Sequence, residues 1–142
     1  MSIKNDVIQF CQCIGREPLL VQGAGGNVSW KDGSVLWVKA SGTWLSDAGA
    51  QEIFVPVDLI HLNRSLKNEN FDVRPTTLGN ATLRPSIETM LHALMPHRIV
   101  VHLHAVDVLA CLVREDAQAL LSRLFEGDDS WTWVPYSRPG AP

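Results

Sequence analysis

The chain has 142 residues, of which 46% are hydrophobic and 19% are charged, and its formal net charge at pH 7 is −3. This composition is typical of a globular protein that buries one hydrophobic core. The sequence has no run of basic residues and no apolar stretch close to the ~20 residues that span a bilayer, so it indicates neither nucleic-acid binding nor membrane insertion. No signal peptide is evident, and the three cysteines are expected to be reduced thiols in a cytoplasmic protein.

The first quarter of the chain predicts one helix and one hairpin. Apolar residues recur at helical spacing over 3–14, and Gly15 follows them, so an amphipathic helix is expected there. A glycine-rich segment, GAGGNVS at 23–29, precedes two strand-like runs that Asp32-Gly33 separates. This dipeptide is a hairpin signal, and residues 34–42 are expected to form the second strand.

The middle of the chain alternates between strand and helix patterns. Residues 53–57 predict a strand, and Asp58 is placed to cap the short helix that follows. The segment 71–85 contains two prolines and no periodicity, so a loop is expected. Pro85 then opens an amphipathic helix over 85–95, and residues 99–104 read as a strand.

The last third predicts two helices, over 106–113 and 116–125, and a closing strand over 131–136. Helices and strands alternate without repeats or an internal linker. This order predicts an α/β fold in which helices pack on a sheet.

Two histidines, His102 and His104, interrupt the apolar strand pattern. Side chains at i and i+2 of a strand leave the same face, with Cα atoms ~6.6 Å apart. Two imidazoles at that separation can meet at one zinc ion, since zinc–nitrogen bonds are ~2.0–2.1 Å long. The alternative is that each ring forms an ordinary hydrogen bond in the core or at a strand end.

Two other features have both a functional and a structural interpretation. Glu88 lies in the first turn of the predicted 85–95 helix, where the helix dipole favours a negative charge, but it could also be a metal ligand or a base. The glycines of 23–29, with Ser41-Gly42, could form a concave nest of amides for a phosphate or could simply be turn glycines. Ser86, at the predicted helix start, adds a hydroxyl suited to an anion.

Four motifs in chain order are similar to those of one family. They are Gly-Gly-Asn-x-Ser at 25–29, Ser-Gly-Thr at 41–43, Arg-Pro-Ser-x-Glu at 84–88 and Val-His-x-His at 101–104. This order resembles the class II aldolase/adducin family, in particular the aldolase part of aldolase/short-chain dehydrogenase fusions. The resemblance implies a three-layer α-β-α sandwich around a mixed, largely antiparallel sheet. It implies a single domain over residues 1–142, incomplete at its C-terminal end.

The resemblance also implies a role for each matched residue. His102 and His104 match two of the three zinc-binding histidines, and Glu88 matches the acid/base glutamate, which can also touch the metal. The positions that match the phosphate site are Asn27, Ser41, Gly42 and Ser86. The implied reaction is reversible cleavage of a ketose 1-phosphate into dihydroxyacetone phosphate and an aldehyde. By this resemblance Zn²⁺, or another divalent metal, would polarise the carbonyl while Glu88 moves a proton at the adjacent carbon.

Two departures from the family pattern shape the expected activity. Ile87 stands where the family often has a second serine, and no histidine follows His104 to supply the third zinc ligand. We therefore expect little aldolase turnover from these 142 residues alone. The alternatives are a catalytically incomplete domain that acts as a binding or structural subunit, and a related sugar-phosphate epimerase or dehydratase. A small-molecule sugar phosphate is the expected partner, and the resemblance implies a homo-oligomer, a tetramer.

A cupin-type metal barrel, which also uses His-x-His, is the less favoured fold. It needs a glutamate a few residues after the second histidine, whereas the segment 105–110 has only Asp107. The helix predicted over 106–113 also argues against a barrel.

Overall fold

Local sequence signals account for the first elements of the computed structural model, which describes residues 2–138. The amphipathic segment forms helix α1 (Ile3–Ile14), as predicted, and Gly15 is its C-cap residue. The turn at Asp32-Gly33 is also confirmed, because Gly33 has φ +58°, a left-handed conformation that glycine adopts without steric cost. It joins strand β1 (Asn27–Asp32) to β2 (Val35–Lys39).

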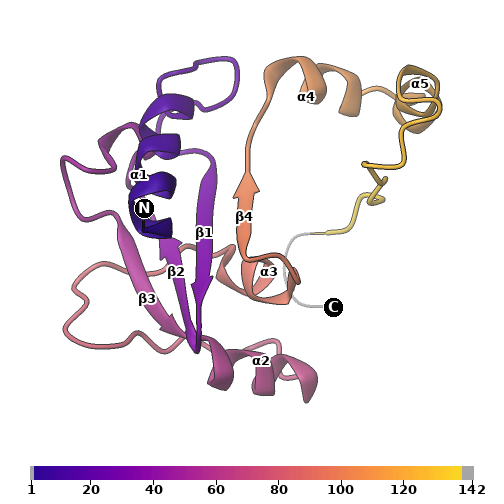
Figure 1. Cartoon of the computed structure of the whole chain (residues 1–142). Helices are drawn as coiled ribbons and strands as arrows, with labels where there is room; N and C mark the ends of the chain where they lie inside the picture. The colour runs from indigo at the N-terminus through magenta and orange to yellow at the C-terminus, as the bar shows by residue number, and fades with distance from the viewer. Residues whose placement is uncertain (1, 139–142) are drawn as a thin grey trace. The chain divides into compact units, whose positions relative to one another are not determined.

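Strands β1 and β2 form the middle of a four-stranded sheet (Figure 1). Strand β3 (Phe54–Asp58) pairs with β2, and β4 (Ile99–His102) pairs with β1, so the order is β3-β2-β1-β4. All three pairings are antiparallel. The largely antiparallel sheet implied by the resemblance is thus present.

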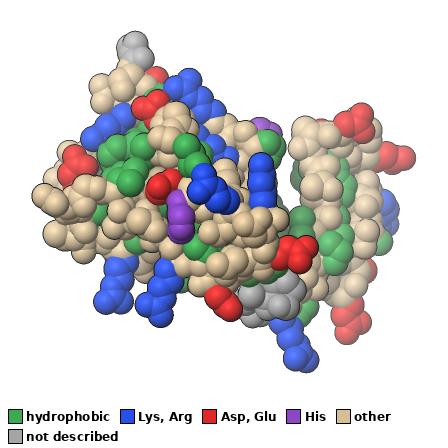
Figure 2. Space-filling view, turned by 90° about the horizontal axis from the view of Figure 1, so that it is seen from below, with side chains coloured by type: hydrophobic (Ala, Val, Ile, Leu, Met, Phe, Trp, Pro, Cys, Tyr) green, Lys and Arg blue, Asp and Glu red, His purple; other side chains and the backbone are tan. Residues whose placement is uncertain are grey.

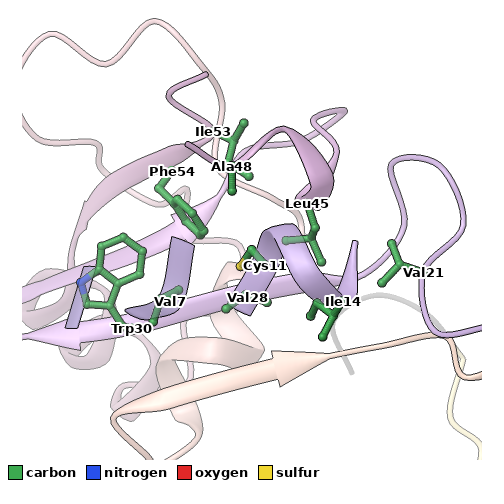
Figure 3. Packing of buried hydrophobic residues seen from close by; sticks show 10 residues of the cluster. All are labelled: Val7, Cys11, Ile14, Val21, Val28, Trp30, Leu45, Ala48, Ile53 and Phe54. Atoms are coloured by element: carbon green, nitrogen blue, oxygen red, sulfur yellow. The ribbon is translucent and has the colours of Figure 1, made fainter. Parts of the chain in front are cut away.

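One face of the sheet packs against α1. Trp30 and Phe54 meet there edge to face, with ring centroids 4.8 Å apart. Cys11 of α1 belongs to the same buried hydrophobic cluster (Figure 3). A short 3₁₀ helix, η1 (Leu45–Asp47), contributes Leu45 to the same cluster. Burial of this apolar surface holds α1 on the sheet.

The opposite face packs against two further helices, α2 (Leu59–Lys67) and α3 (Thr89–Leu94). Its buried cluster contains Leu36 and Val38, which alternate along β2 with residues of the first face. Helices therefore cover both faces of the sheet, which confirms the three-layer architecture.

The helix predicted over 85–95 is shorter than expected and begins at Thr89. Pro85 instead forms a β-bridge with Ala40, and the Ser41 N–H donates to the Arg84 carbonyl at 2.9 Å. This pairing with the end of β2 holds the chain extended where a helix start was expected. Glu88 consequently lies at the N-cap position, not in the first turn.

Two predicted strands also differ from the structure. Strand β4 ends at His102, because its partner β1 begins at Asn27, directly opposite. His104 lies beyond the strand, where its N–H donates to the Leu20 carbonyl at 3.1 Å. Residues 131–136 have no regular secondary structure. A strand needs a neighbour for its backbone hydrogen bonds, and these residues pair with no other segment within residues 2–138.

The chain divides after His104 into two compact units, and the sheet with its helices forms the first. The second unit contains helices α4 (Val106–Leu112) and α5 (Ala117–Leu124), close to the two helices predicted there. Between them Arg114 forms a two-point ion pair with Asp116, at 2.7 and 2.9 Å. Of the helices within residues 2–138, none combines the length and the apolarity that crossing a membrane requires.

The Asp58 cap of α2 is present as predicted and can be tested. The His61 N–H donates to Asp58 Oδ1 at 2.8 Å. We expect Asp58→Ala to lower the free energy of unfolding by ~1 kcal/mol, since it leaves a helix-end N–H without that acceptor. Urea denaturation followed by circular dichroism measures the change. Asp58→Asn keeps an acceptor oxygen and should lose much less, so equal losses in both variants would contradict the capping role.

Candidate functional site

Three strand ends meet at one end of the sheet. Because β1 runs antiparallel to both neighbours, it begins where β2 and β4 end. Asn27, the first residue of β1, lies opposite His102, the last residue of β4, while Lys39 ends β2. The Ala40–Pro85 bridge brings the segment 86–88 to the same end. Strand register therefore gathers residues that are far apart in the sequence.

A pocket of about 170 Å³ lies among these strand ends. Six of the predicted site residues line it, namely Asn27, Ser41, Gly42, Ser86, Glu88 and His104. Other lining residues come from the glycine loop and from Lys39. A larger hollow of about 380 Å³, beside Trp37 and Leu78, contains none of the predicted residues.

Glu88 and His102 form the closest polar contact of the site. Glu88 Oε1 lies 2.5 Å from His102 Nδ1, and both side chains are about one-quarter to one-third exposed. The contact is within ion-pair distance but lacks hydrogen-bond geometry, so His102 Nδ1 is buried without a hydrogen-bond partner among residues 2–138. A carboxylate oxygen and an imidazole nitrogen thus lie in direct contact at this site.

His104 lies beside His102 although it is outside the strand. Their ring centroids are 4.9 Å apart and the rings are inclined by 64°. A Cβ added to Gly25 would lie 3.3 Å from His104 Nδ1 and 2.8 Å from the Gln22 carbonyl oxygen. Glycine at 25 therefore lets the loop approach the histidine closely.

The hydroxyl of Ser86 is linked to the carboxylate. Ser86 Oγ donates to Glu88 Oε2 at 3.4 Å and accepts from the Glu88 N–H at 3.3 Å. Ser41 and Gly42 line the other side of the pocket, where Gly42 adopts φ +76°. Hydroxyls and backbone amides of this kind suit the oxygens of a phosphate group.

Lys39 is a site residue that sequence reasoning missed. Its side chain is 2% exposed, and Nζ donates to the carbonyls of Ala24 at 3.1 Å and Thr43 at 2.7 Å. Burial lowers the pKa of Lys39, and the Glu88 carboxylate opposes that shift. The available signal was a lysine at the end of an apolar strand, directly before Ala-Ser-Gly.

His92 was also not included among the predicted site residues. It is completely buried on α3, one turn after Glu88, with Nδ1 2.7 Å from Ser29 Oγ and no partner for Nε2 within residues 2–138. Burial lowers the pKa of His92 to about 4, despite the opposing effect of Glu88. This ring is neutral at pH 7 and extends the polar cluster beneath the site.

The imidazole and carboxylate side chains at this site are of the types that bind a divalent metal. Two imidazoles and a carboxylate are ligands that zinc accepts, and the contact of Glu88 Oε1 with His102 Nδ1 brings two of these groups together. Within residues 2–138, however, no three His, Cys, Asp or Glu side chains stand close enough together to hold an ion. His102, His104 and Glu88 are thus neighbours without forming a closed three-ligand cluster.

Comparison with known proteins identifies what this arrangement is similar to. Residues 5–142 match the family described as Class II Aldolase and Adducin N-terminal domain. A curated relative, the uncharacterized oxidoreductase YuxG of Bacillus subtilis (strain 168), is 27% identical over 151 residues. That match covers 95% of this chain but 22% of the relative.

A solved structure has the same architecture. It is the N-terminal Class II Aldolase domain of a conserved protein from Thermoplasma acidophilum, which matches with a TM-score of 0.72 and 25% sequence identity. The match covers 87% of this chain and 65% of that chain. This agrees with the resemblance identified from the four motifs.

Proposed function

We propose that this chain, which belongs to the Class II Aldolase and Adducin N-terminal domain family, acts in a metal-dependent aldolase-type lyase. The proposed reaction is cleavage of a ketose 1-phosphate into dihydroxyacetone phosphate and an aldehyde. The observation that carries it is the 2.5 Å contact of Glu88 with His102, beside a pocket lined by hydroxyls and a glycine loop. A base, two metal donors and an anion site are what such a reaction needs in one place.

His102 and His104 would hold the metal, with Glu88 within reach of it. A bound divalent cation supplies Lewis-acid stabilisation of the negative charge that develops on the substrate carbonyl oxygen. His102 is the last residue of β4, and the His104 backbone is held beyond the strand by its hydrogen bond to the Leu20 carbonyl.

Glu88 is the proposed acid/base. In cleavage, the bond between the hydroxyl-bearing carbon next to the carbonyl and the following carbon breaks, the hydroxyl of the following carbon loses its proton to become the aldehyde, and the Glu88 carboxyl gives a proton to the carbon left beside the carbonyl. In the reverse reaction, the Glu88 carboxylate removes that proton from dihydroxyacetone phosphate. Ser86 donates to this carboxylate and so orients it. If Glu88 binds the metal in the resting state, it must leave the metal before it can accept a proton.

Asn27, Ser41, Gly42 and Ser86 are the proposed phosphate-binding residues. They line the same pocket as Glu88, so a phosphate held there places the rest of the substrate near the carboxylate. Holding one end of the substrate fixes the carbon from which the proton is removed.

The chain spans 22% of its curated relative and 65% of the solved structure. We propose that residues 1–142 belong to one functional domain and that the protein assembles as a homo-oligomer, a tetramer by resemblance. The oxidoreductase name belongs to a relative of which most lies outside the match.

Hydrogen exchange into dihydroxyacetone phosphate tests the function directly. In D₂O, the chain supplied with Zn²⁺ should replace one of the two hydrogens on the hydroxyl-bearing carbon, because a single carboxylate approaches from one side. Proton NMR follows the loss of that signal. Hydrogen exchange needs only the base and the metal, so an assay of exchange is more sensitive than an assay of aldol cleavage.

The absence of three close metal donors favours a second candidate, a domain that binds its ligands without turnover. Binding of metal and of dihydroxyacetone phosphate with no exchange above the protein-free rate would support that candidate and contradict the lyase. Exchange without cleavage of any ketose 1-phosphate, but with epimerisation of a pentulose phosphate, would point to an epimerase.

A further inference from the structure

His92 differs from the histidines at the surface of the molecule. Figure 2 shows histidine side chains that reach solvent, whereas His92 is 0% exposed. Burial lowers its pKa to about 4, so the ring is neutral at pH 7 and has one N–H and one lone pair. Burying a polar ring is costly unless the ring acquires a hydrogen-bond partner. The position of His92 therefore calls for a physical explanation.

Ser29 of β1 is the partner that holds the ring. His92 Nδ1 lies 2.7 Å from Ser29 Oγ, and the serine is also completely buried. The other ring nitrogen, Nε2, has no hydrogen-bond partner within residues 2–138. Among the residues that the structure describes, Ser29 is thus the side chain that orients the His92 ring by a directional bond.

Helix α3 needs such an anchor because it is short. It has six residues, and isolated helices shorter than ~12–15 residues are marginal in water. Its place on the sheet is therefore set by contacts with the strands. At its C-terminal end, Lys31 of β1 donates to the carbonyls of Ala93 and Met95. His92 supplies a second contact to the same strand, and this contact is nearer in sequence to Glu88.

The register of the sheet puts Ser29 and His102 on the same face. Side chains alternate along β1, and Trp30 belongs to the cluster packed on α1, so Ser29 and Asn27 point to the opposite face. Asn27 pairs directly with His102, which places the His102 side chain on that face too. The contact of Glu88 with His102 therefore lies on the side of the sheet that α3 covers.

Glu88 and His92 are also linked along the chain. The His92 N–H donates to the Glu88 carbonyl at 3.0 Å, and residues four apart lie on the same side of a helix. Four residues of a helix span ~6 Å and two residues of a strand span ~6.8 Å, so the contacts to Ser29 and to His102 have similar spacing on both elements. A ring fixed on Ser29 thus sets where the Glu88 carboxylate meets His102.

We propose that His92 is a positioning residue, whose bond to Ser29 fixes α3 on the sheet so that the Glu88 carboxylate contacts His102. This inference rests on the proposed function, because it concerns the residue proposed as the acid/base. His92 itself does not touch the substrate. Loss of the buried bond is expected to displace Glu88 while the loops that line the pocket stay in place.

Proton–nitrogen NMR of the imidazole rings, in the metal-free chain at one pH, tests the proposal without requiring turnover. In the unsubstituted chain, Glu88→Gln should change the Nδ1 chemical shift of His102, because an amide replaces the carboxylate in contact with the ring. In a His92→Leu background the same substitution should lose most of this effect, since Glu88 no longer lies against His102. His102→Ala identifies the signal.

Matched variants separate positioning from a general loss of stability. His92→Asn places a polar δ atom at the same number of bonds from the backbone as Nδ1, so it can keep the bond to Ser29 and should retain much of the response. Leu62 is completely buried on α2, at the same face of the sheet. Leu62→Ala should lower the unfolding temperature but leave the response of His102 unchanged. Ser29→Ala should reproduce His92→Leu, and it replaces that variant in the test if His92→Leu does not fold.

Hydrogen exchange of dihydroxyacetone phosphate provides a second readout. With Zn²⁺ supplied, His92→Leu should lower kcat about 10- to 100-fold, because a displacement of about 1 Å can cost about 10²-fold in rate. KM should change little, since the residues proposed for the phosphate are unaltered. A loss of folded protein alone would lower the amount of active enzyme without this dependence on Glu88.

Three results would overturn the proposal. They are no response of His102 to Glu88→Gln in the unsubstituted chain, a full response in the folded His92→Leu variant, and an equal loss of the response in Leu62→Ala. Failure of the proposed function gives a different result. A response that depends on His92, without any hydrogen exchange by the unsubstituted chain, supports this inference and contradicts the lyase. Exchange that depends on Glu88 but not on His92 supports the lyase and contradicts this inference.

Discussion

Replacing Glu88 by glutamine should reduce the metal-dependent hydrogen exchange of dihydroxyacetone phosphate by at least about 100-fold. A general base typically contributes 10²- to 10⁴-fold, and an amide of nearly the same shape cannot accept the proton. Glu88 makes no side-chain capping bond to α3, so the fold should be retained. Initial rates from proton NMR, at saturating metal and substrate, measure the effect.

The chain offers a matched acidic control. Glu52 has an 81% exposed side chain and forms an ion pair with Lys4 at 3.6 Å, outside the pocket. Glu52→Gln should leave the exchange rate unchanged. Glu88→Asp keeps a carboxylate but withdraws it from His102, so an intermediate rate is expected. Exchange by Glu88→Gln within about threefold of the unsubstituted chain would rule out Glu88 as the base.

Loss of either ring of the His102/His104 pair should weaken zinc binding by at least about 100-fold, and loss of both should abolish specific binding. Changes in the groups that merely support a metal ligand cost 10- to 100-fold in affinity, so loss of a ligand should cost no less. Competition against a chromophoric chelator gives the affinity of His102→Ala and His104→Ala. The protein must be purified without a polyhistidine tag.

The same binding should appear as thermal stabilisation. A ligand that binds only the folded state raises the unfolding temperature, so zinc should stabilise the unsubstituted chain and not the double variant. His61 is exposed on α2, and His61→Ala serves as the control that should bind zinc normally. Unchanged zinc affinity in the double variant would disprove a metal site at this pair.

The structure confirms the sequence predictions that depend on short-range patterns. Helix α1, the turn at Gly33 and the cap at Asp58 each follow from a few adjacent residues. Their physical causes are local, namely an apolar stripe, a left-handed turn residue and an acceptor for a helix-end N–H. The order of helices and strands was therefore sufficient to predict helices packed on a sheet.

Predictions failed where distant segments compete with a local signal. Pro85 predicts the start of a helix, but backbone pairing with Ala40 holds this residue in an extended conformation. Residues 131–136 have a strand pattern but pair with no neighbour within residues 2–138. The strand containing His102 ends opposite Asn27, where β1 begins, which no pattern within 99–104 reveals.

For the candidate site, the order of four motifs was enough to predict residues with suitable chemistry, namely the histidines, Glu88 and the residues proposed for the phosphate. The contact of Glu88 with His102, and the place of Lys39 and His92 in the same polar cluster, followed only from the fold. The reason is physical. Residue type and spacing act through neighbours along the chain, whereas the burial of Lys39 and His92 depends on strand register and on loops that are distant in sequence.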